Sequence, residues 1–299
     1  MPFNKSDNGW MGRMKFVTNH VRRLLVGTGL TFLGRRNFYR FSRVLMDGAR
    51  LDVPNDPRSN GEGLVQEAVL NCSSKTNAVV VFDVGANIGE WTHSLLAKAD
   101  AQKVNIRVHA FEPCRGTYQT LVQRIKLIEN SGCVKTVEKA CSDSTGTSQF
   151  HVVGNGSPVN TLVLGANQGV IRIELVETVA IDDYCRKVGL NRIALAKIDA
   201  EGHDFDVIKG AYAMLVAHAI DVVQFEYNQK WVFARRFLRD CFELLCPLGY
   251  RVGKITPGGI EFYTGWVPEL ETFREGNYIA CSAASGIRFK EILPPWERH

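Results

Sequence analysis

The stretch from Val79 to Leu96, VVVFDVGANIGEWTHSLL, constrains the fold of this chain more than any other. Residues 79–82 are apolar, largely β-branched and few, which is typical of a buried strand. Asp83 ends this run, and the tight loop that follows contains Gly85, Asn87 and Gly89. Glycines let the backbone of such a loop approach a ligand closely, and helical spacing of apolar residues begins just after it. A strand, a glycine loop and a helix in this order predict the first unit of a doubly wound, nucleotide-binding sheet.

The loop itself indicates which ligand is bound. It reads G-x-N-x-G, with an acid two residues before its first glycine, whereas a dinucleotide site reads G-x-G-x-x-G. A pyrophosphate favours three glycines and an uncharged helix N-terminus. An acid beside the loop instead suits a ligand that carries an amine, such as S-adenosylmethionine. We therefore predict S-adenosylmethionine as the cofactor, with a dinucleotide-dependent oxidoreductase as the alternative.

Apolar runs and helical spacing alternate along the rest of the chain. Further strands are predicted over residues 106–111, 134–137, 149–153, 170–179, 193–198, 220–225, 250–254, 259–263 and 278–281. Helices are predicted over 62–71, 117–128, 181–188, 205–218 and 231–246, with two or three short helices over 10–50 that break near Gly27, Gly29 and Gly34. The segments 149–153 and 170–179 are expected to pair as a hairpin, with 154–169 as a mobile loop between them. This alternation predicts an α/β fold, a mostly parallel sheet with helices on both faces.

Acids mark the ends of four predicted strands: Asp83, Glu112, Asp199 and Glu226. Ligands of a doubly wound sheet bind beyond the carboxyl ends of its strands, so the fold should gather these acids at one edge. Glu112 is expected to accept both ribose hydroxyls, and Asp83 to hold the ammonium of the methionine part, directly or through water. Asp143 could accept from the adenine amino group, or it could be an ordinary turn residue.

Six segments in this order resemble the FkbM family of S-adenosylmethionine-dependent methyltransferases over about residues 64–265. They are VVVFDVGANIGEWT, VHAFEPCRGTYQTL, KACSDSTG, TVAIDDYC, LAKIDAEGHDFDVIKGA and VVQFEYN. The resemblance implies a class I (Rossmann-like) methyltransferase fold, with seven strands of which the last is antiparallel. It also implies O-methylation of hydroxyls on sugars, glycolipids or related small molecules. The cofactor-binding set that we predict is Asp83, Gly85, Ala86, Asn87, Gly89, Glu112, Pro113, Ser142 and Asp143.

Catalysis requires the acceptor to be aligned with the sulfonium methyl group and an alcohol to lose its proton. The predicted catalytic residues Asp199, Glu201 and His203 lie at or just past the fourth core strand. His203 is a candidate base because histidine titrates near neutral pH, although it departs from the family pattern and could be an ordinary helix residue. A metal-free mechanism is preferred. The alternative is a Mg²⁺ ion bound by Asp199, Glu226 and Asn228, whose side chains offer oxygen ligands.

The ends of the chain predict the domain organisation. Residues 1–50 hold ten Lys or Arg and two acids, so this segment carries +8 while the other 249 residues carry −3. We expect a basic helical extension over 1–61, a methyltransferase domain over 62–285 and a tail over 286–299. The extension could contact an anionic membrane surface or an acidic substrate, or it could be an amphipathic helix packed on the domain.

Composition narrows the class of protein. Eight irregularly spaced cysteines without a C-x-x-C motif indicate a reduced, cytoplasmic protein, and no signal peptide or membrane span is expected. Aromatic residues in the basic extension are too few to predict nucleic-acid binding. A small-molecule or glycan acceptor is the expected partner. A catalytically silent binding module that kept the cofactor fold remains an alternative.

Overall fold

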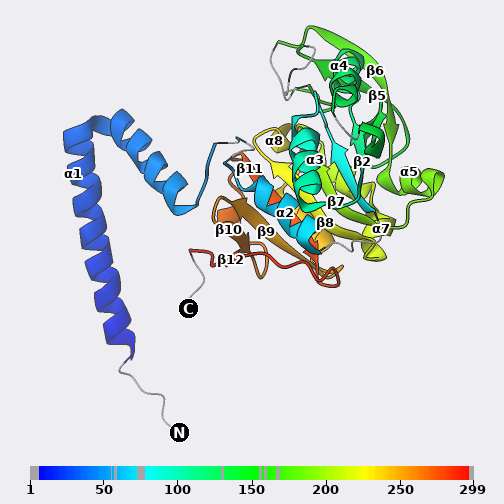
Figure 1. Cartoon of the computed structure of the whole chain (residues 1–299). Coiled ribbons are helices and arrows are strands. Elements are labelled where there is room, and N and C mark those ends of the chain that lie inside the picture. Colours follow the sequence, from blue (N-terminus) through cyan, green and yellow to red (C-terminus); the bar gives the residue numbers. More distant parts are fainter. Residues whose placement is uncertain are drawn as a thin grey trace. The chain divides into compact units, whose positions relative to one another are not determined.

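The computed structural model describes residues 7–54, 56, 59–72, 78–128, 131–154, 157, 160–165 and 169–295, with side chains from residue 20 onward except at residue 131. The chain divides into two compact units, Met1–Asp52 and Val53–His299. The first unit contains α1 (Asp7–Ala49), which bends where Gly34 takes a positive φ of 69° (Figure 1). The break predicted at Gly34 is therefore confirmed. Gly27 and Gly29 lie inside the helix, so the breaks predicted there were wrong.

The second unit is built on a sheet of nine strands in the order β12-β10-β9-β11-β8-β7-β1-β2-β3 (Figure 1). These strands are β1 (Val79–Val84), β2 (Ile106–Phe111), β3 (Val134–Val137), β7 (Ile193–Ile198), β8 (Ile220–Tyr227), β9 (Tyr250–Thr256), β10 (Gly259–Phe262), β11 (Gly276–Ser282) and β12 (Glu291–Ile292). β1 runs parallel to both β2 and β7, and β7 runs parallel to β8. The predicted mostly parallel sheet is confirmed.

The sheet contains the seven-strand order expected of a class I methyltransferase and extends it. β11 pairs antiparallel with β8 on one side and with β9 on the other, as predicted for the last strand of that order. Two short strands then lengthen this edge, since β10 pairs with β9 and β12 with β10. The sheet is therefore wider than the seven strands predicted.

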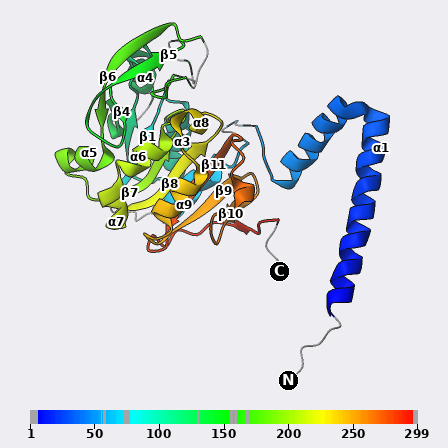
Figure 2. The same cartoon turned by 180° about the vertical axis from the view of Figure 1, so that it is seen from behind.

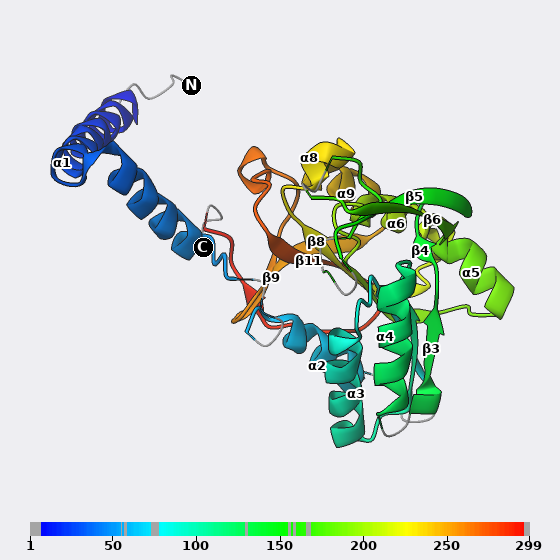
Figure 3. The ribbon, with the colours of Figure 1, turned by 90° about the horizontal axis from the view of Figure 1, so that it is seen from above.

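Helices cover both faces of the sheet, as predicted (Figures 2 and 3). On one face lie α2 (Glu62–Cys72), α3 (Glu90–Gln102) and α4 (Arg115–Lys126). On the other lie α5 (Ile181–Val188), α6 (Asp204–Lys209), α7 (Tyr212–Val216), α8 (Trp231–Ala234) and α9 (Leu238–Leu245). Because alternate residues of a strand face opposite sides, Val81 packs with α2 and α3 while Phe82 belongs to the core beneath the second group. Each face thus has its own buried core.

A buried polar cluster holds α2 against the sheet. Glu62, the first residue of α2, accepts hydrogen bonds from Gln224 Nε2 of β8 at 2.7 Å and from Asn277 Nδ2 of β11 at 3.2 Å. Asn60 Nδ2 donates to the same carboxylate at 2.6 Å, and its Oδ1 accepts from the Glu62 N–H. A buried carboxylate requires such donors, so they fix where the domain begins on the sheet.

Two predicted helices are each broken in two. The helix predicted over 205–218 divides into α6 and α7 around Gly210, where a Cβ would lie 2.0 Å from the backbone oxygen of Ser142. The helix predicted over 231–246 divides into α8 and α9 at Arg235, whose φ is +55°. Both breaks follow from contacts and backbone angles that helical spacing does not reveal.

A smaller sheet lies beside the main one, in the order β4-β6-β5. Its strands are β4 (Ala140–Cys141), β5 (Gly146–Val152) and β6 (Arg172–Val179). β5 and β6 pair antiparallel, which confirms the predicted hairpin. Of the predicted loop 154–169, residues 155, 156, 158, 159 and 166–168 lie outside the described part. Within the rest, the backbone of Thr161 exchanges two hydrogen bonds with that of His151 on β5.

Candidate active site

A cavity opens at the carboxyl ends of β1, β2 and β7, with about 510 Å³ of empty space including its open mouth. Its walls come from the glycine loop after β1, the end of β2, the segment before and in β4, the loop over β5 and the end of β7. The lining residues are Val84, Gly85, Asn87, Phe111, Glu112, Pro113, Lys139, Ala140, Cys141, Phe150, Ser157, Asn160, Leu162, Asp199, Ala200 and Glu201.

The glycine loop packs directly against the loop after β7. A Cβ on Gly85 would lie 1.9 Å from the backbone oxygen of Asp199, and Gly85 has a φ of +76°. For both reasons, no residue other than glycine fits at position 85 unless the backbone shifts. The N–H groups of Gly85 and Ala86 both donate to the carbonyl of Phe111, which ties the loop to the end of β2. Ala86 and Gly89 do not line the cavity, and the Gly89 N–H donates to the carbonyl of Ala86 within the loop at 2.8 Å.

Glu112 lies where the prediction requires a ribose acid, on the wall of the cavity just after β2. Its carboxylate accepts the backbone N–H of Asn87 at 3.0 Å and that of Cys114 at 2.9 Å. Burial raises the pKa of Glu112 to about 7, against these two hydrogen bonds, which lower it. Two donors orient the side chain and leave acceptor lone pairs for hydroxyl groups of a ligand.

Asp83 is buried beneath the loop and does not line the cavity. Its Oδ2 accepts from Thr92 Oγ1 of α3 at 2.6 Å, and its Oδ1 lies 3.6 Å from Lys197 Nζ. Lys197 is opposite Asp83 in the register of β1 and β7. The structure thus places a protein cation where the sequence suggested the ammonium of a ligand, so direct contact of Asp83 with that ammonium does not fit this arrangement.

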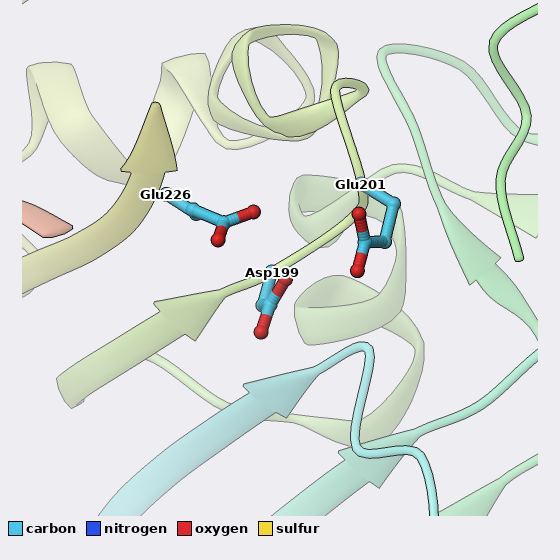
Figure 4. A group of neighbouring side chains, drawn as sticks. All are labelled: Asp199, Glu201 and Glu226. Atoms are coloured by element: carbon cyan, nitrogen blue, oxygen red, sulfur yellow. The ribbon is translucent and has the colours of Figure 1, made fainter. Parts of the chain in front are cut away.

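Three carboxylates converge beside the cavity: those of Asp199, Glu201 and Glu226, with one oxygen of each within 4.8 Å of the others (Figure 4). Lys197 lies 3.2 Å from Asp199, and Lys230 forms an ion pair with Glu201. Burial raises the pKa of Glu201 to about 7, and the nearby Asp199 raises it further. Burial and the same neighbouring acids also hold the pKa of Glu226 well above its usual range.

This group bears on the predicted metal alternative. The structure joins Glu201 with Asp199 and Glu226 and gives Asn228 another role. Asn228 Nδ2 donates to Glu226 at 2.6 Å, and its Oδ1 accepts the backbone N–H of Lys230 at 2.8 Å. Asn228 therefore positions Glu226 and the chain near Lys230, and its oxygen is already engaged.

Ser142, Asp143 and His203 form a network of their own outside the cavity wall. His203 Nε2 lies 2.9 Å from Ser142 Oγ, and its Nδ1 lies 3.6 Å from Asp206. Asp143 pairs with Lys209 at 3.0 Å. Burial lowers the pKa of His203. With both ring nitrogens facing protein groups, His203 is arranged to hold loops together, which does not fit the role of a base.

Sequence reasoning missed the two lysines and one acid that organise this site. Lys197 stands two residues before Asp199 in an otherwise apolar strand, so the two share a side of the chain. A buried lysine in such a strand signals nearby acids. Asp204 is fully buried and accepts the backbone N–H groups of Ala200 and Gly202, yet burial raises its pKa to about 8. No simple signal marks Lys230.

The known proteins that this chain resembles include several methyltransferases. The chain is 30% identical over 139 residues to the hexuronic acid methyltransferase AglP of Haloferax volcanii, covering 44% of this chain and 49% of that protein. It thus spans about half the length of this curated relative. A solved methyltransferase FkbM from Methylobacillus flagellatus is 17% identical, over 68% of this chain and 43% of that one, with a TM-score of 0.42. A precorrin-6y C5,15-methyltransferase from Geobacter metallireducens is 13% identical, over 73% and 88% of the two chains, with a TM-score of 0.37.

The family model described as the methyltransferase FkbM domain matches residues 83–252, which is more than half of the chain. The match begins at the acid before the glycine loop and ends within β9, so it contains every residue of the site described above. Methyltransferases of this kind use S-adenosylmethionine, and the cavity beside the glycine loop suits such a cofactor. The chain belongs to the FkbM methyltransferase family.

Proposed function

We propose that this protein transfers the methyl group of S-adenosylmethionine to a hydroxyl of a saccharide or glycolipid. One observation carries the proposal: Glu112 and Gly85 line the same cavity as Asp199 and Glu201. The first pair suits a cofactor, and the second pair suits an acceptor that must lose a proton. Similarity to a hexuronic acid methyltransferase supports a saccharide as the acceptor class.

In this proposal the cofactor lies against the glycine loop, and Glu112 accepts its ribose hydroxyls. Glu112→Ala should weaken binding of S-adenosylmethionine by about 1.5–3 kcal/mol, the usual effect of losing charge-assisted hydrogen bonds. Isothermal titration calorimetry measures this, with Glu243→Ala on the exposed side of α9 as the matched control. Equal affinities for Glu112→Ala and the control would remove Glu112 from the cofactor site.

Glu201 takes the proton of the acceptor hydroxyl. A base works best with a pKa near the working pH, and that of Glu201 is about 7. Its neighbour Lys230 can hold the carboxylate in place before and after proton transfer. Glu201→Gln should lower turnover by about 10²–10⁴-fold and leave cofactor affinity nearly intact. His203→Ala, whose side chain faces Ser142 and Asp206, should keep turnover within about threefold, since it only positions loops.

The experiment follows transfer of labelled methyl groups to neutral and uronate-containing oligosaccharides, with linkage analysis of the product. A hexuronic acid also offers a carboxylate, which is ionised at neutral pH and needs no base. If the product is a methyl ester and the Glu201→Gln variant forms it at the wild-type rate, the acceptor is the carboxylate of the uronate and not a hydroxyl. If a chelator abolishes turnover and added Mg²⁺ restores it, Asp199, Glu201 and Glu226 instead bind a metal ion. Binding of NAD without binding of S-adenosylhomocysteine would favour the oxidoreductase alternative.

A further inference from the structure

The N-terminal unit exposes far more apolar surface than a solvated helix does. The bend of α1 brings Phe38 against Gly29, where a Cβ would lie 2.3 Å from the aromatic ring. Among the described side chains of α1, those from residue 20 onward, twelve large apolar ones are exposed: Val21, Leu24, Leu25, Val26, Leu30, Phe32, Leu33, Tyr39, Phe41, Val44, Leu45 and Met46. Phe32 alone is 82% exposed. An exposed apolar patch of this extent marks a site of interaction.

After the bend, three apolar and three basic side chains of α1 lie on opposite faces, with the exposed side chains of Tyr39, Val44 and Met46 between them. The apolar stripe, at positions i, i+3 and i+7, consists of Phe38, Phe41 and Leu45. The basic stripe, at positions i, i+4 and i+7, consists of Arg36, Arg40 and Arg43. At 100° per residue the two stripes lie on opposite sides of the helix. Apolar rings on one face and arginines on the other are typical of helices that lie in a lipid interface.

Before the bend, residues 24–33 (LLVGTGLTFL) carry no charge, and arginine pairs flank them at 22–23 and 35–36. Ten helical residues are about 15 Å long, which is half the thickness of the hydrocarbon core of a bilayer. No helix in the described part of the chain is long and apolar enough to cross a membrane. This segment can therefore enter one leaflet without crossing the bilayer.

We propose that residues 21–46 of α1 lie in the headgroup region of an anionic lipid bilayer and insert their apolar side chains into it. Charge favours this partner over the others. Residues 1–50 carry +8, so a second copy would bring like charge against like charge, and the remaining 249 residues carry only −3. An anionic bilayer offers both opposite charge and apolar depth. This inference concerns α1 alone and does not depend on the proposed reaction.

Flotation of the full chain with vesicles tests the proposal. Vesicles of phosphatidylcholine with phosphatidylglycerol should bind at least about tenfold more protein than phosphatidylcholine alone, and rising salt should release part of it. The triple variant Leu25→Ser, Phe32→Ser and Phe41→Ser should reduce binding to anionic vesicles about tenfold or more, since it removes inserted side chains. The triple variant Arg36→Gln, Arg40→Gln and Arg43→Gln should lower affinity and weaken the salt dependence.

Matched controls come from the end of α4, where Leu127 is 87% exposed and Lys126 is exposed beside it. Leu127→Ser and Lys126→Gln should bind vesicles as the wild type does. If the apolar triple variant also binds like the wild type, α1 does not insert and the proposal is wrong. Failure of the wild type to bind anionic vesicles would equally overturn it. A dimer in light scattering would then show that a second copy covers the apolar side chains of α1. A monomer in which hydrogen exchange shows α1 protected would show that the chain's own domain covers them.

Discussion

At the scale of single residues, Lys197 organises the carboxyl edge of the sheet. It is buried between Asp83 and Asp199, whose carboxylates lie 3.6 and 3.2 Å from its Nζ. Both acids raise the pKa of Lys197 although its burial alone would lower it, so it stays charged. One cation therefore links the acid beneath the glycine loop to an acid that lines the cavity.

Lys197→Met should destabilise the domain by about 3–5 kcal/mol, because it leaves two acids near each other without their shared cation. Urea unfolding at pH 7 measures the change. Lys98→Met is the control, since Lys98 pairs with Glu67 near the surface and should change stability by no more than about 1 kcal/mol. If Lys197→Met and Lys98→Met lower the free energy of unfolding by similarly small amounts, Lys197 is not required to stabilise Asp83 and Asp199.

For single residues, the sequence predicted positions that depend on the local chain, while the ribose-binding role of Glu112 stays a prediction. Glu112 follows directly from the end of a strand, and the structure places it on the cavity wall. The roles predicted for Asp83, Ser142 and His203 fared differently because they depend on partners far away in the sequence. Lys197 lies against Asp83, and Ser142 and His203 contact each other, and no spacing pattern reveals such distant pairs.

At the scale of elements, the contact between the loop after β1 and the loop after β7 decides the geometry of the site. Gly85→Ala should destabilise the domain and abolish detectable cofactor binding, because the new Cβ would meet the Asp199 carbonyl at 1.9 Å. Gly189→Ala is a control for backbone strain, since Gly189 has a similar φ of +70° with nothing within 4 Å of a Cβ.

Thermal unfolding and calorimetry with S-adenosylhomocysteine separate the two effects. Gly189→Ala should lower the free energy of unfolding by only roughly 1 kcal/mol, the cost of an alanine in the left-handed backbone region, and should keep wild-type affinity. If Gly85→Ala loses no more stability than Gly189→Ala and still binds cofactor, the close packing of the two loops is not required.

Element boundaries were predicted well where packing follows the local pattern. The bounds of β2, β3, α5 and β7 agree with the predicted ranges to the residue. Predictions failed where a long-range contact cuts a helix, as at Gly210 against Ser142, and where single-residue backbone angles decide, as at Arg235. Helical spacing continues across both breaks, so the sequence gives no warning of them.

At the scale of the whole molecule, buried acids make stability depend on pH. Burial raises the pKa of Glu112 and of Glu201 to about 7 and that of Asp204 to about 8. The folded chain therefore holds these protons up to a higher pH than the unfolded chain does, and stability falls as pH rises towards 8. His109 and His203, whose pKa values are lowered, act in the opposite direction up to about pH 7.5, because the unfolded chain still binds protons there that the folded chain does not.

Between pH 6.5 and 8.0 the three acids should outweigh the two histidines and decide the trend. Each acid should reduce the free energy of unfolding by about 1 kcal/mol over this range. Denaturant unfolding of the ligand-free protein at the two pH values measures the fall, and Glu201→Gln should make it smaller. Stability that stays constant or rises towards pH 8.0 would mean that these acids are ionised in the folded protein.

The polar cluster at the start of α2 has a mechanical consequence. The second unit begins at Val53, and soon after it Glu62 is bonded to β8 and β11. The bonds of Glu62 therefore resist a force that pulls on residues 1–52 before that force can separate α2 from the sheet. Gln224, which donates a hydrogen bond to Glu62, lies two residues before Glu226 on the same strand. A tether at one end of the chain thus ends on the strand that carries one of the three acids beside the cavity.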